Sequence, residues 1–383
     1  MQGSAPHILV LGGGFGGLCA ANEIRSRFPP SQVKITVVDK KDWFMVGFAK
    51  LWIIRGVRTF ENSTGSLHQL PKKGIGFVKE EVTRIDLENK KVRTNKQTLS
   101  YDFLIIAMGS TLAPEKIPGL GEHGMILYDH GHLTKIHQRL KEMRSGKIAI
   151  SVMGMPYKCP PAPFEAGLLI DSMLKEAGTR DSIQIDFYSP APITLPAAGP
   201  EVSKKVHQML DSENIRFHKS HKVLSVEKNR LVFENSKAEF DLLLAVPPHV
   251  APAVIYESGL AREGGFITIS RDCKTSFENV YAVGDVTSLP VGEGAAVPKA
   301  GVFAEGEATA VAKNIISKIN SEDDSSLFDG KGSCFLESGK ETAALIEVDM
   351  FSEDRPSTGL TDSTEQHLSE KLEFERDRLA RWL

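Results

Sequence analysis

Residues 8–17 read ILVLGGGFGG, and this stretch sets how the N-terminal part of the chain folds. Four apolar residues, as in a buried parallel strand, lead directly into a glycine-rich turn. The flanking pattern predicts a strand at 8–11, a helix at 19–28 that two prolines stop, and a second strand at 33–38. Strand, glycine turn, helix and strand in this order predict a βαβ unit that binds a dinucleotide.

The glycines of the turn stand in G-x-G-x-x-G spacing at Gly12, Gly14 and Gly17. One glycine makes the tight turn, one lets the backbone approach a pyrophosphate, and one allows the helix to pack closely on the strand. The helix N-terminus then faces the anionic phosphates. We therefore expect Gly12, Gly14, Phe15 and Gly17 to contact the dinucleotide. Asp39, at the end of the second strand, is expected to accept hydrogen bonds from the adenosine ribose.

The composition is that of a globular protein of two or three domains. The chain has 383 residues, 41% hydrophobic and 25% charged, which excludes a wholly disordered protein. The net charge of −3 argues against a nucleic-acid-binding surface over the whole molecule. The cysteines, at Cys19, Cys159, Cys273 and Cys334, form no CxxC motif, so a zinc ribbon and a disulfide-rich scaffold are excluded and no metal site is predicted.

No targeting or membrane-spanning segment is expected. The first residues, MQGSAPHILV, pass directly into the first strand without the basic and long apolar regions of a secretory signal. No apolar run approaches the roughly 18 residues that cross a bilayer. We therefore expect a cytoplasmic or peripherally membrane-bound protein, and the residues leave open whether it forms a homo-oligomer.

Two later segments indicate which dinucleotide is bound. YDFLIIAMGS (101–110) is a buried strand that ends in a glycine turn, and TSFENVYAVGD (275–285) is a strand that ends in Gly-Asp. Together with the first turn, these segments resemble the flavoprotein disulfide reductase superfamily, whose final Gly-Asp presents a carboxylate to the flavin ribityl chain. The resemblance implies that FAD is bound, with Gly109, Gly284 and Asp285 among its contacts.

The same resemblance implies a second dinucleotide-binding domain, whose strand is KIAISVM (147–153). The turn after it, GMPYKCPPAPFEAG (154–167), has no second or third glycine at phosphate-binding spacing, and its prolines lack N–H donors. We therefore expect an NAD(P)-type domain that has lost its nicotinamide site. The predicted fold class is α/β with two Rossmann-like domains. An FAD domain is expected at 1–115 and 268–319, a second domain at 116–267, and a small C-terminal α+β segment at 320–383.

Cys159 and Cys334 lie in segments that indicate one particular family within this superfamily. YKCPPAPFE (157–165), VPKAGVFAE (297–305) and GSCFLESG (332–339) resemble the sulfide:quinone oxidoreductase and flavocytochrome c sulfide dehydrogenase family. The resemblance covers almost the whole chain. In that family two cysteines form a redox-active disulfide beside the flavin, and the matching positions are Cys159 and Cys334. Glu165 matches a carboxylate near the disulfide, and Lys299 matches a lysine near the flavin ring.

The resemblance implies FAD-dependent oxidation of sulfide or a related small sulfur species. Hydrosulfide attacks one sulfur of the disulfide, which leaves a persulfide on one cysteine and a thiolate on the other. Two electrons pass to the flavin, with Lys299 stabilising negative charge and Glu165 moving protons. The electrons then leave to a quinone or to an electron-accepting protein. Cys19 and Cys273 lie outside these motifs and are expected to be buried structural residues.

The chain departs from this family's pattern in two places. MILYDHGHL (125–133) has Tyr128 where many sulfide:quinone oxidoreductases carry a third cysteine. WFMVGFAKLW (43–52) has no cysteine, whereas the flavocytochrome c branch attaches its FAD in this region. We therefore expect non-covalent FAD and a mechanism that uses two cysteines. No CxxCH haem motif is present.

The C-terminal residues bear on the electron acceptor. SEKLEFERDRLARWL (369–383) predicts a charged surface helix that packs on the body through Leu372, Phe374, Leu379 and Trp382. Contact of this helix with a membrane or a partner subunit stays open, and the ending resembles the quinone-using branch of the family. Two alternative functions also stay open: an NAD(P)H-dependent flavin dehydrogenase or disulfide reductase, and a flavoprotein subunit of an electron-transfer complex.

Overall fold

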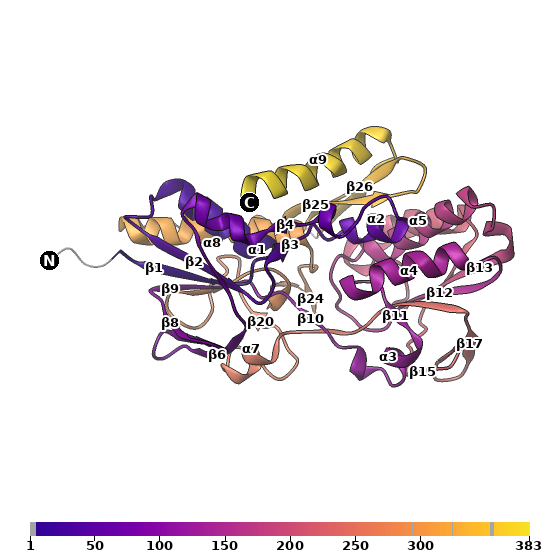
Figure 1. Ribbon diagram of the computed structural model, residues 1–383, viewed down its shortest axis with the longest axis horizontal. Coiled ribbons are helices and arrows are strands. Elements are labelled where there is room, and N and C mark those ends of the chain that lie inside the picture. The colour runs from indigo at the N-terminus through magenta and orange to yellow at the C-terminus, as the bar shows by residue number, and fades with distance from the viewer. Residues whose placement is uncertain (1–4, 293, 324, 353–355) are drawn as a thin grey trace.

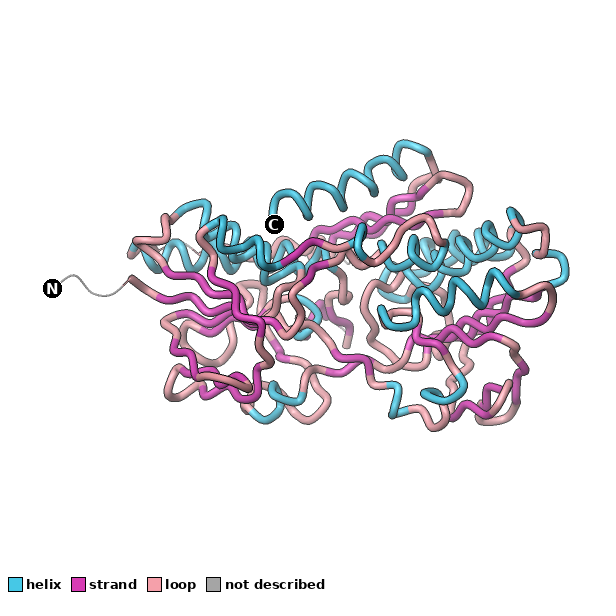
Figure 2. The backbone as a smooth tube through the Cα atoms, viewed as in Figure 1, coloured by secondary structure: helices cyan, strands magenta, loops and turns pink. Residues whose placement is uncertain are grey.

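The computed structural model describes residues 5–292, 294–323, 325–352 and 356–383. Two five-stranded parallel sheets lie side by side along the long axis of the molecule (Figures 1 and 2). A small antiparallel sheet and the C-terminal helix lie above the junction between them. This arrangement confirms the predicted fold class, an α/β protein with two Rossmann-like units.

The first sheet is built around the glycine turn. Helices α1 (Phe15–Arg27) and α8 (Gly301–Asn320) pack against each other on one of its faces (Figure 1). A three-stranded antiparallel sheet, β6-β7-β8, and the short helix α7 (Ala253–Glu257) lie on the other side. The order of the parallel strands is β21-β9-β1-β2-β5, with bounds Val280–Ala282, Phe103–Ile106, His7–Leu11, Lys34–Asp39 and Gly76–Lys79; β6, β7 and β8 are Val82–Asp86, Lys91–Thr94 and Thr98–Ser100.

Helix α1 begins at Phe15, four residues before the predicted start. Its N-cap is Gly14, which has extended backbone angles of φ −96° and ψ −164°. The helix therefore starts inside the glycine turn itself. As a result, the N–H groups of its first turn, which have no partner within the helix, face the space beyond the strand ends.

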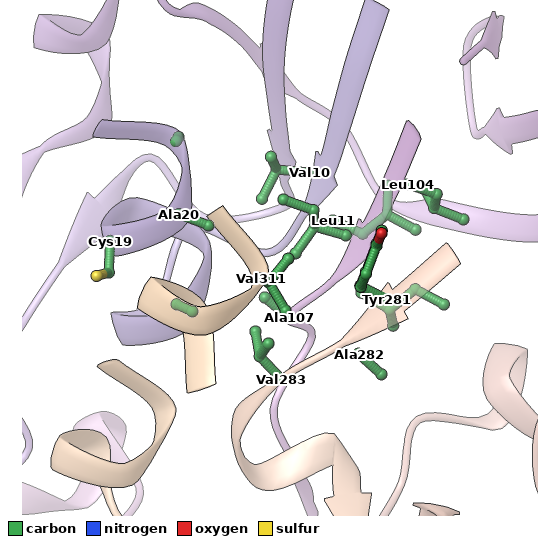
Figure 3. Close-up of a cluster of buried hydrophobic side chains, with 14 of the residues drawn as sticks. Val10, Leu11, Cys19, Ala20, Leu104, Ala107, Tyr281, Ala282, Val283 and Val311 are labelled. Atoms are coloured by element: carbon green, nitrogen blue, oxygen red, sulfur yellow. The ribbon is translucent and has the colours of Figure 1, made fainter. Parts of the chain in front are cut away.

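Figure 3 shows how the core joins these elements. Val10 and Leu11 of β1 lie among Leu104 of β9, Val283 just after β21, and Val311 of α8. Cys19 lies on α1 with its sulfur turned away from the strands (Figure 3). That sulfur is 3.6 Å from the carbonyl oxygen of Glu305 and 3.7 Å from Thr309 Oγ1, both on α8. Cys19 is therefore buried in helix packing, as the sequence predicted.

The second sheet has a different core on each face. Apolar residues of α4 (His130–Glu142), α5 (Ala162–Glu176) and α6 (Gly199–Ser212) cover one face, and α2 (Ala49–Arg55) packs on α4 and α5. The antiparallel sheet β15-β16-β17 and α3 (Leu120–His123) cover the other face. The order of the parallel strands is β11-β18-β12-β13-β14, with bounds Met125–Ile126, Leu242–Val246, Gly146–Val152, Ile183–Tyr188 and Ile215–His218; β15, β16 and β17 are Ser225–Glu227, Arg230–Val232 and Lys237–Glu239.

The C-terminal segment forms an antiparallel sheet and a long helix. Strands β25 (Lys331–Glu337), β26 (Ala343–Asp349) and β27 (Ser357–Leu360) pair in sequence order. Helix α9 (Glu365–Trp382) packs on β25, β26 and α1. It begins four residues earlier than predicted, because the side chain of Thr364 caps it by accepting a hydrogen bond from the N–H of His367 at 3.1 Å.

Short two-stranded ribbons connect these larger units. Their pairs are β3 (Trp43–Phe44) with β4 (Gly65–Ser66), β10 (Thr111–Leu112) with β19 (His249–Val250), β20 (Ile267–Thr268) with β22 (Thr287–Ser288), and β23 (Pro290–Gly292) with β24 (Ala295–Ala296).

Within the described part of the chain, no helix combines the length and apolar character needed to cross a bilayer.

The inward face of α9 is more charged than predicted. Leu372, Phe374 and Leu379 contact the body, but they stay half-buried. The fully buried residues of the helix are Lys371, Glu375 and Trp382. Of these, the sequence analysis predicted only Trp382, because it selected contacts by apolar character.

We predict that replacing Trp382 with alanine lowers the free energy of unfolding by about 3 kcal/mol, through loss of buried area and creation of a cavity. Trp382 is 1% exposed, and its ring packs edge-on against Phe15 with centroids 5.5 Å apart. Urea denaturation followed by circular dichroism measures the effect. Arg376→Ala, at an exposed position of the same helix, is the control and should change stability by no more than about 0.5 kcal/mol. Equal effects of the two variants would contradict the anchoring role of Trp382.

Candidate active site

The glycine turn has the geometry that its spacing predicts. Gly12 has a φ of +108°, and a Cβ atom there would lie 2.2 Å from the carbonyl oxygen of Ala107. A Cβ atom at Gly17 would lie 1.9 Å from the carbonyl oxygen of Gly12, so any side chain would separate α1 from the turn. A Cβ atom at Gly14 would meet no atom within 4 Å. Gly14 therefore faces open space, where a ligand can approach the backbone closely.

This open space is a cavity that extends from the glycine turn to Cys159. Its wall contains six of the predicted FAD contacts, namely Gly14, Phe15, Gly109, Gly284, Asp285 and Lys299. Gly12, Gly17 and Asp39 are not part of the wall. They shape the glycine turn from behind the wall. The cavity thus brings together residues from both ends of the predicted FAD domain and the first cysteine of the second domain.

Asp39 holds the glycine turn in place. Its Oδ2 accepts a hydrogen bond from the N–H of Gly13 at 2.7 Å, and its Oδ1 accepts one from the N–H of Lys41 at 2.8 Å. These bonds fix the turn against the end of β2. The predicted contact of Asp39 with a ribose stays a prediction, made through the lone pairs that the backbone bonds leave available.

Lys299 supports the Gly-Asp turn from below. Its ammonium group donates to the carbonyl oxygens of Asp285 and Thr287, both at 2.8 Å, and lies 3.4 Å from the ring centroid of Phe266. Burial lowers the pKa of Lys299 to about 8. The carboxylate of Asp285 has no hydrogen-bond partner among the described residues, and burial raises its pKa. This carboxylate is therefore free to accept hydrogen bonds from a ligand in the cavity.

A second buried carboxylate, which the sequence analysis missed, fixes the same turn. Glu307 of α8 accepts a hydrogen bond from the N–H of Gly284 through Oε2 at 2.5 Å. Burial raises the pKa of Glu307 to about 8. Glu307 lies six residues after the start of α8, outside every motif of the sequence, so only the packing of α8 on the turn reveals its role.

The turn that carries Cys159 is held by backbone hydrogen bonds. The N–H of Cys159 donates to the carbonyl oxygen of Lys299 at 2.6 Å. The carbonyl oxygen of Cys159 accepts from the hydroxyl of Tyr128 at 3.2 Å and from the N–H of Ala162, the first residue of α5, at 3.0 Å. Cys159 has a φ of +50°. Tyr128, which stands where the family resemblance would place a third cysteine, therefore helps to hold Cys159 in position.

Cys334 reaches the same region from β25. It lines a small apolar pocket on the far side of the cysteine turn, together with Pro160, Pro161, Ala300 and Ile346. Charge on Cys159 raises the pKa of Cys334, in addition to the larger effect of burial, so the two thiols are electrostatically coupled. Burial likewise raises the pKa of Cys159 to about 12. Both are free thiols in this structure, and their disulfide stays a prediction.

Two lysines that the sequence analysis did not select as site residues also line the cavity. Lys50 of α2 and Lys158, beside Cys159, have no ion-pair partner in the part of the chain that the structure describes. Burial lowers the pKa of Lys50 to about 7 and also lowers that of Lys158. The sequence alone could have indicated Lys158 as a cavity residue, because it precedes a predicted redox cysteine. It could not have indicated Lys50, because the position of that side chain depends on how α2 packs.

Glu165 lies just behind the cysteine turn in a buried ion cluster. The ammonium group of Lys371, on α9, donates to Glu165 Oε1 and to Glu337 Oε2, the second at 2.8 Å. Burial raises the pKa of Glu165 to about 7, although Lys371 opposes the shift. Burial alone would lower the pKa of Lys371, but the two carboxylates raise it above its ordinary value. The sequence analysis found Glu165 and missed Lys371 and Glu337.

The residues of the cavity fit FAD. Its wall carries four ammonium groups, those of Lys41, Lys50, Lys158 and Lys299, against the single carboxylate of Asp285. A diphosphate supplies two negative charges, and the free N–H groups at the start of α1 supply donors for it. Gly14 leaves the space for a close backbone approach.

Comparisons with known proteins agree with this geometry. Residues 6–154 and 182–308 match the family described as "Pyridine nucleotide-disulphide oxidoreductase". The sulfide-quinone reductase of Aquifex aeolicus is 27% identical over 341 residues, which cover 84% of this chain and 78% of that protein. The mitochondrial sulfide:quinone oxidoreductase of Dictyostelium discoideum is 26% identical over 307 residues, which cover 76% and 67%.

A solved structure is similar over nearly the whole chain. The sulfide:quinone oxidoreductase of Aquifex aeolicus aligns with a TM-score of 0.90 and 24% identity, covering 99% of this chain and 91% of that one, so the two folds are alike. The family match spans both parallel sheets but leaves out 155–181, the segment of Cys159 and α5. Because the family match covers most of the chain and the glycine and Gly-Asp turns meet at one cavity, the chain belongs to the pyridine nucleotide-disulphide oxidoreductase family and is an FAD-dependent oxidoreductase similar to sulfide:quinone oxidoreductases.

Proposed function

We propose that the protein oxidises sulfide through a Cys159–Cys334 redox disulfide and passes the electrons by way of FAD to a quinone. One observation carries this proposal: Cys159 lines the dinucleotide cavity, and Cys334 lies beside it on an apolar pocket of its own. A thiol pair between a flavin site and a second pocket suits the transfer of electrons from a small sulfur compound. The names of the two relatives supply sulfide as the substrate and quinone as the acceptor.

The two pockets suggest a different task for each cysteine. In the proposed first step, hydrosulfide attacks the sulfur of Cys334 from the apolar pocket. The Cys159–Cys334 bond breaks, a new S–S bond forms, and the products are a Cys334 persulfide and a Cys159 thiolate. A second hydrosulfide takes the outer sulfur, which leaves as hydrogen disulfide ion and returns Cys334 to a thiol. The pair is then a thiolate and a thiol.

Re-forming the Cys159–Cys334 disulfide completes the catalytic cycle. Formation of the Cys159–Cys334 bond releases two electrons and one proton, so that two hydrosulfide ions yield one hydrogen disulfide ion, one proton and two electrons. FAD held in the cavity would supply the two-electron acceptor for this closure, and the quinone would be the final acceptor. Glu165, whose pKa burial raises to about 7, is the proposed base for the released proton.

The charges around the cavity favour this sequence. Lys50 and Lys158 are coupled to Cys159, and their positive charge stabilises its thiolate. The N–H of Ala162, at the start of α5, also lowers the pKa of Cys159, while burial raises it more strongly. The thiolate therefore depends on nearby positive charge.

We predict that the FAD is not covalently attached, because no cysteine lies in the region 43–52. Acid precipitation of the purified protein should leave the flavin in the supernatant, where its absorbance is measured. Yellow colour that stays with the pellet after washing would contradict the prediction.

We predict that Cys159→Ser and Cys334→Ser each slow flavin reduction by sulfide at least about a hundredfold, because either change removes the disulfide electrophile. Anaerobic stopped-flow absorbance at the flavin band gives the rates. Cys19→Ser is the matched control, because Cys19 is a buried cysteine between α1 and α8, away from the cavity wall. It should keep the wild-type rate.

The same experiment separates the alternatives. Reduction by sulfide at the wild-type rate in either serine variant would overturn the disulfide mechanism. Rapid reduction by NADH would instead support the nicotinamide-dependent alternative, for which the cysteine turn leaves no glycine-rich phosphate site.

We predict that Glu165→Gln removes a pH-dependent part of the rate. The carboxylate is protonated below its pKa of about 7 and is a base above it. Hydrosulfide titrates in a similar range, but it does so in both proteins, so the ratio of wild-type to variant rate isolates Glu165. This ratio should rise from near one at about pH 5.5 to at least about tenfold at about pH 8.5. A ratio that is constant across this range would exclude Glu165 as the base.

A further inference from the structure

The C-terminal helix brings a fully buried cation to the cysteine site. Lys371 is 0% exposed, and its carboxylate partners Glu165 and Glu337 are 1% and 2% exposed. The Lys371 ammonium group also lies 4.9 Å from the ring centroid of Phe48 and 5.2 Å from that of Trp52. A buried lysine is costly to desolvate, and here two carboxylates and two aromatic faces offset that cost.

The two carboxylates come from the two segments that carry the cysteines. Glu165 is in the first turn of α5, six residues after Cys159. Glu337 is the last residue of β25, three residues after Cys334. Lys371 bonds to both carboxylates at once. A single ammonium group therefore joins the Cys159 segment to the Cys334 segment.

Few other contacts in the cluster could hold Glu165 and Glu337 together. Glu337 also accepts a hydrogen bond from Trp52 Nε1 at 2.9 Å, and its Oε1 lies 3.6 Å from Arg55 NH1, both on α2. For Glu165, Lys371 is the only ion-pair partner among the described residues. Without the ammonium group, Glu165 and Glu337 would be two buried carboxylates that repel each other, which favours separation of their segments.

We propose that Lys371 is a positioning residue, which holds the Cys159 and Cys334 segments together while the bond between their sulfurs is open. This inference rests on the proposed redox role of the cysteine pair. In that cycle the disulfide opens once per turnover, and it must close again between residues that lie on different elements. The ammonium group forms no bond to either sulfur, so opening the disulfide leaves its hydrogen bonds to Glu165 and Glu337 in place. It thereby keeps the effective concentration of one thiol for the other high.

The test measures that effective concentration directly. FAD-loaded protein is equilibrated anaerobically in dithiothreitol buffers of graded oxidised-to-reduced ratio, then alkylated and analysed by peptide mass spectrometry. The fraction of Cys159–Cys334 disulfide at each ratio gives the effective concentration of the pair. Lys371→Met, which keeps the length and packing of the side chain but not its charge, should lower this value at least about tenfold.

A matched control separates positioning from a general loss of stability. Lys175, near the end of α5, also bridges two carboxylates, with Asp171 Oδ2 at 2.7 Å and Glu213 as its other partner. Lys175→Met breaks a more exposed cluster near the other end of the same helix, and neither of its carboxylate partners is Glu165 or Glu337. It should leave the effective concentration within about twofold of wild type, even if its melting temperature falls.

A second variant keeps the inference testable if Lys371→Met does not hold FAD. Glu337→Gln removes the charge that binds Lys371 to the Cys334 segment, and it should lower the effective concentration at least about threefold. A wild-type value in both Lys371→Met and Glu337→Gln would overturn the positioning role. An equal fall in Lys175→Met would overturn it as well. If the wild-type protein itself forms no Cys159–Cys334 disulfide at any ratio, the proposed redox pair fails and this inference fails with it.

Discussion

The peptide hydrogen bond from the N–H of Cys159 to the carbonyl oxygen of Lys299, 2.6 Å long, joins the two halves of the molecule at the candidate active site. Lys299 is fixed at its other end, because its ammonium group donates to the carbonyl oxygens of Asp285 and Thr287. The cysteine turn and the Gly-Asp turn are therefore one hydrogen-bonded unit. Any ligand that packs on the Gly-Asp turn is consequently placed against Cys159 as well.

The second sheet shows how a dinucleotide fold can serve a different chemistry. Strand β12 still leads through a turn into α5, as in a nucleotide-binding βαβ unit. In such units the helix N-terminus binds phosphate. Here a proline-rich turn occupies that place, and the N–H of Ala162 bonds to the carbonyl oxygen of Cys159 instead. The helix N-terminus thus supports a thiol, and its dipole favours the negative charge of a thiolate.

Helix α9 is held by charge as much as by apolar packing. Lys371, Glu375, Arg378 and Trp382 recur at helical spacing and form its inward stripe. Glu375 pairs with Arg58 at 3.2 Å, and Arg378 pairs with Glu305 at 3.1 Å. Because buried ions are costly unless they are paired, the charged residues of this stripe help to specify the position of the helix. A helix docked by apolar contacts alone would lack that precision beside the cysteines.

The sequence by itself determined the parts of this protein that depend on local geometry. The G-x-G-x-x-G turn, the Gly-Asp turn and the altered cysteine turn were all predictable, because tight turns and close approaches admit few residue types. Only the tertiary structure revealed the roles of Lys50, Glu307, Glu337 and Lys371. Their roles depend on contacts between elements that are distant in the chain. Buried charges find their partners only when these elements pack together. From sequence alone, a charged residue on a helix is assigned to the surface, because its buried partners are not known.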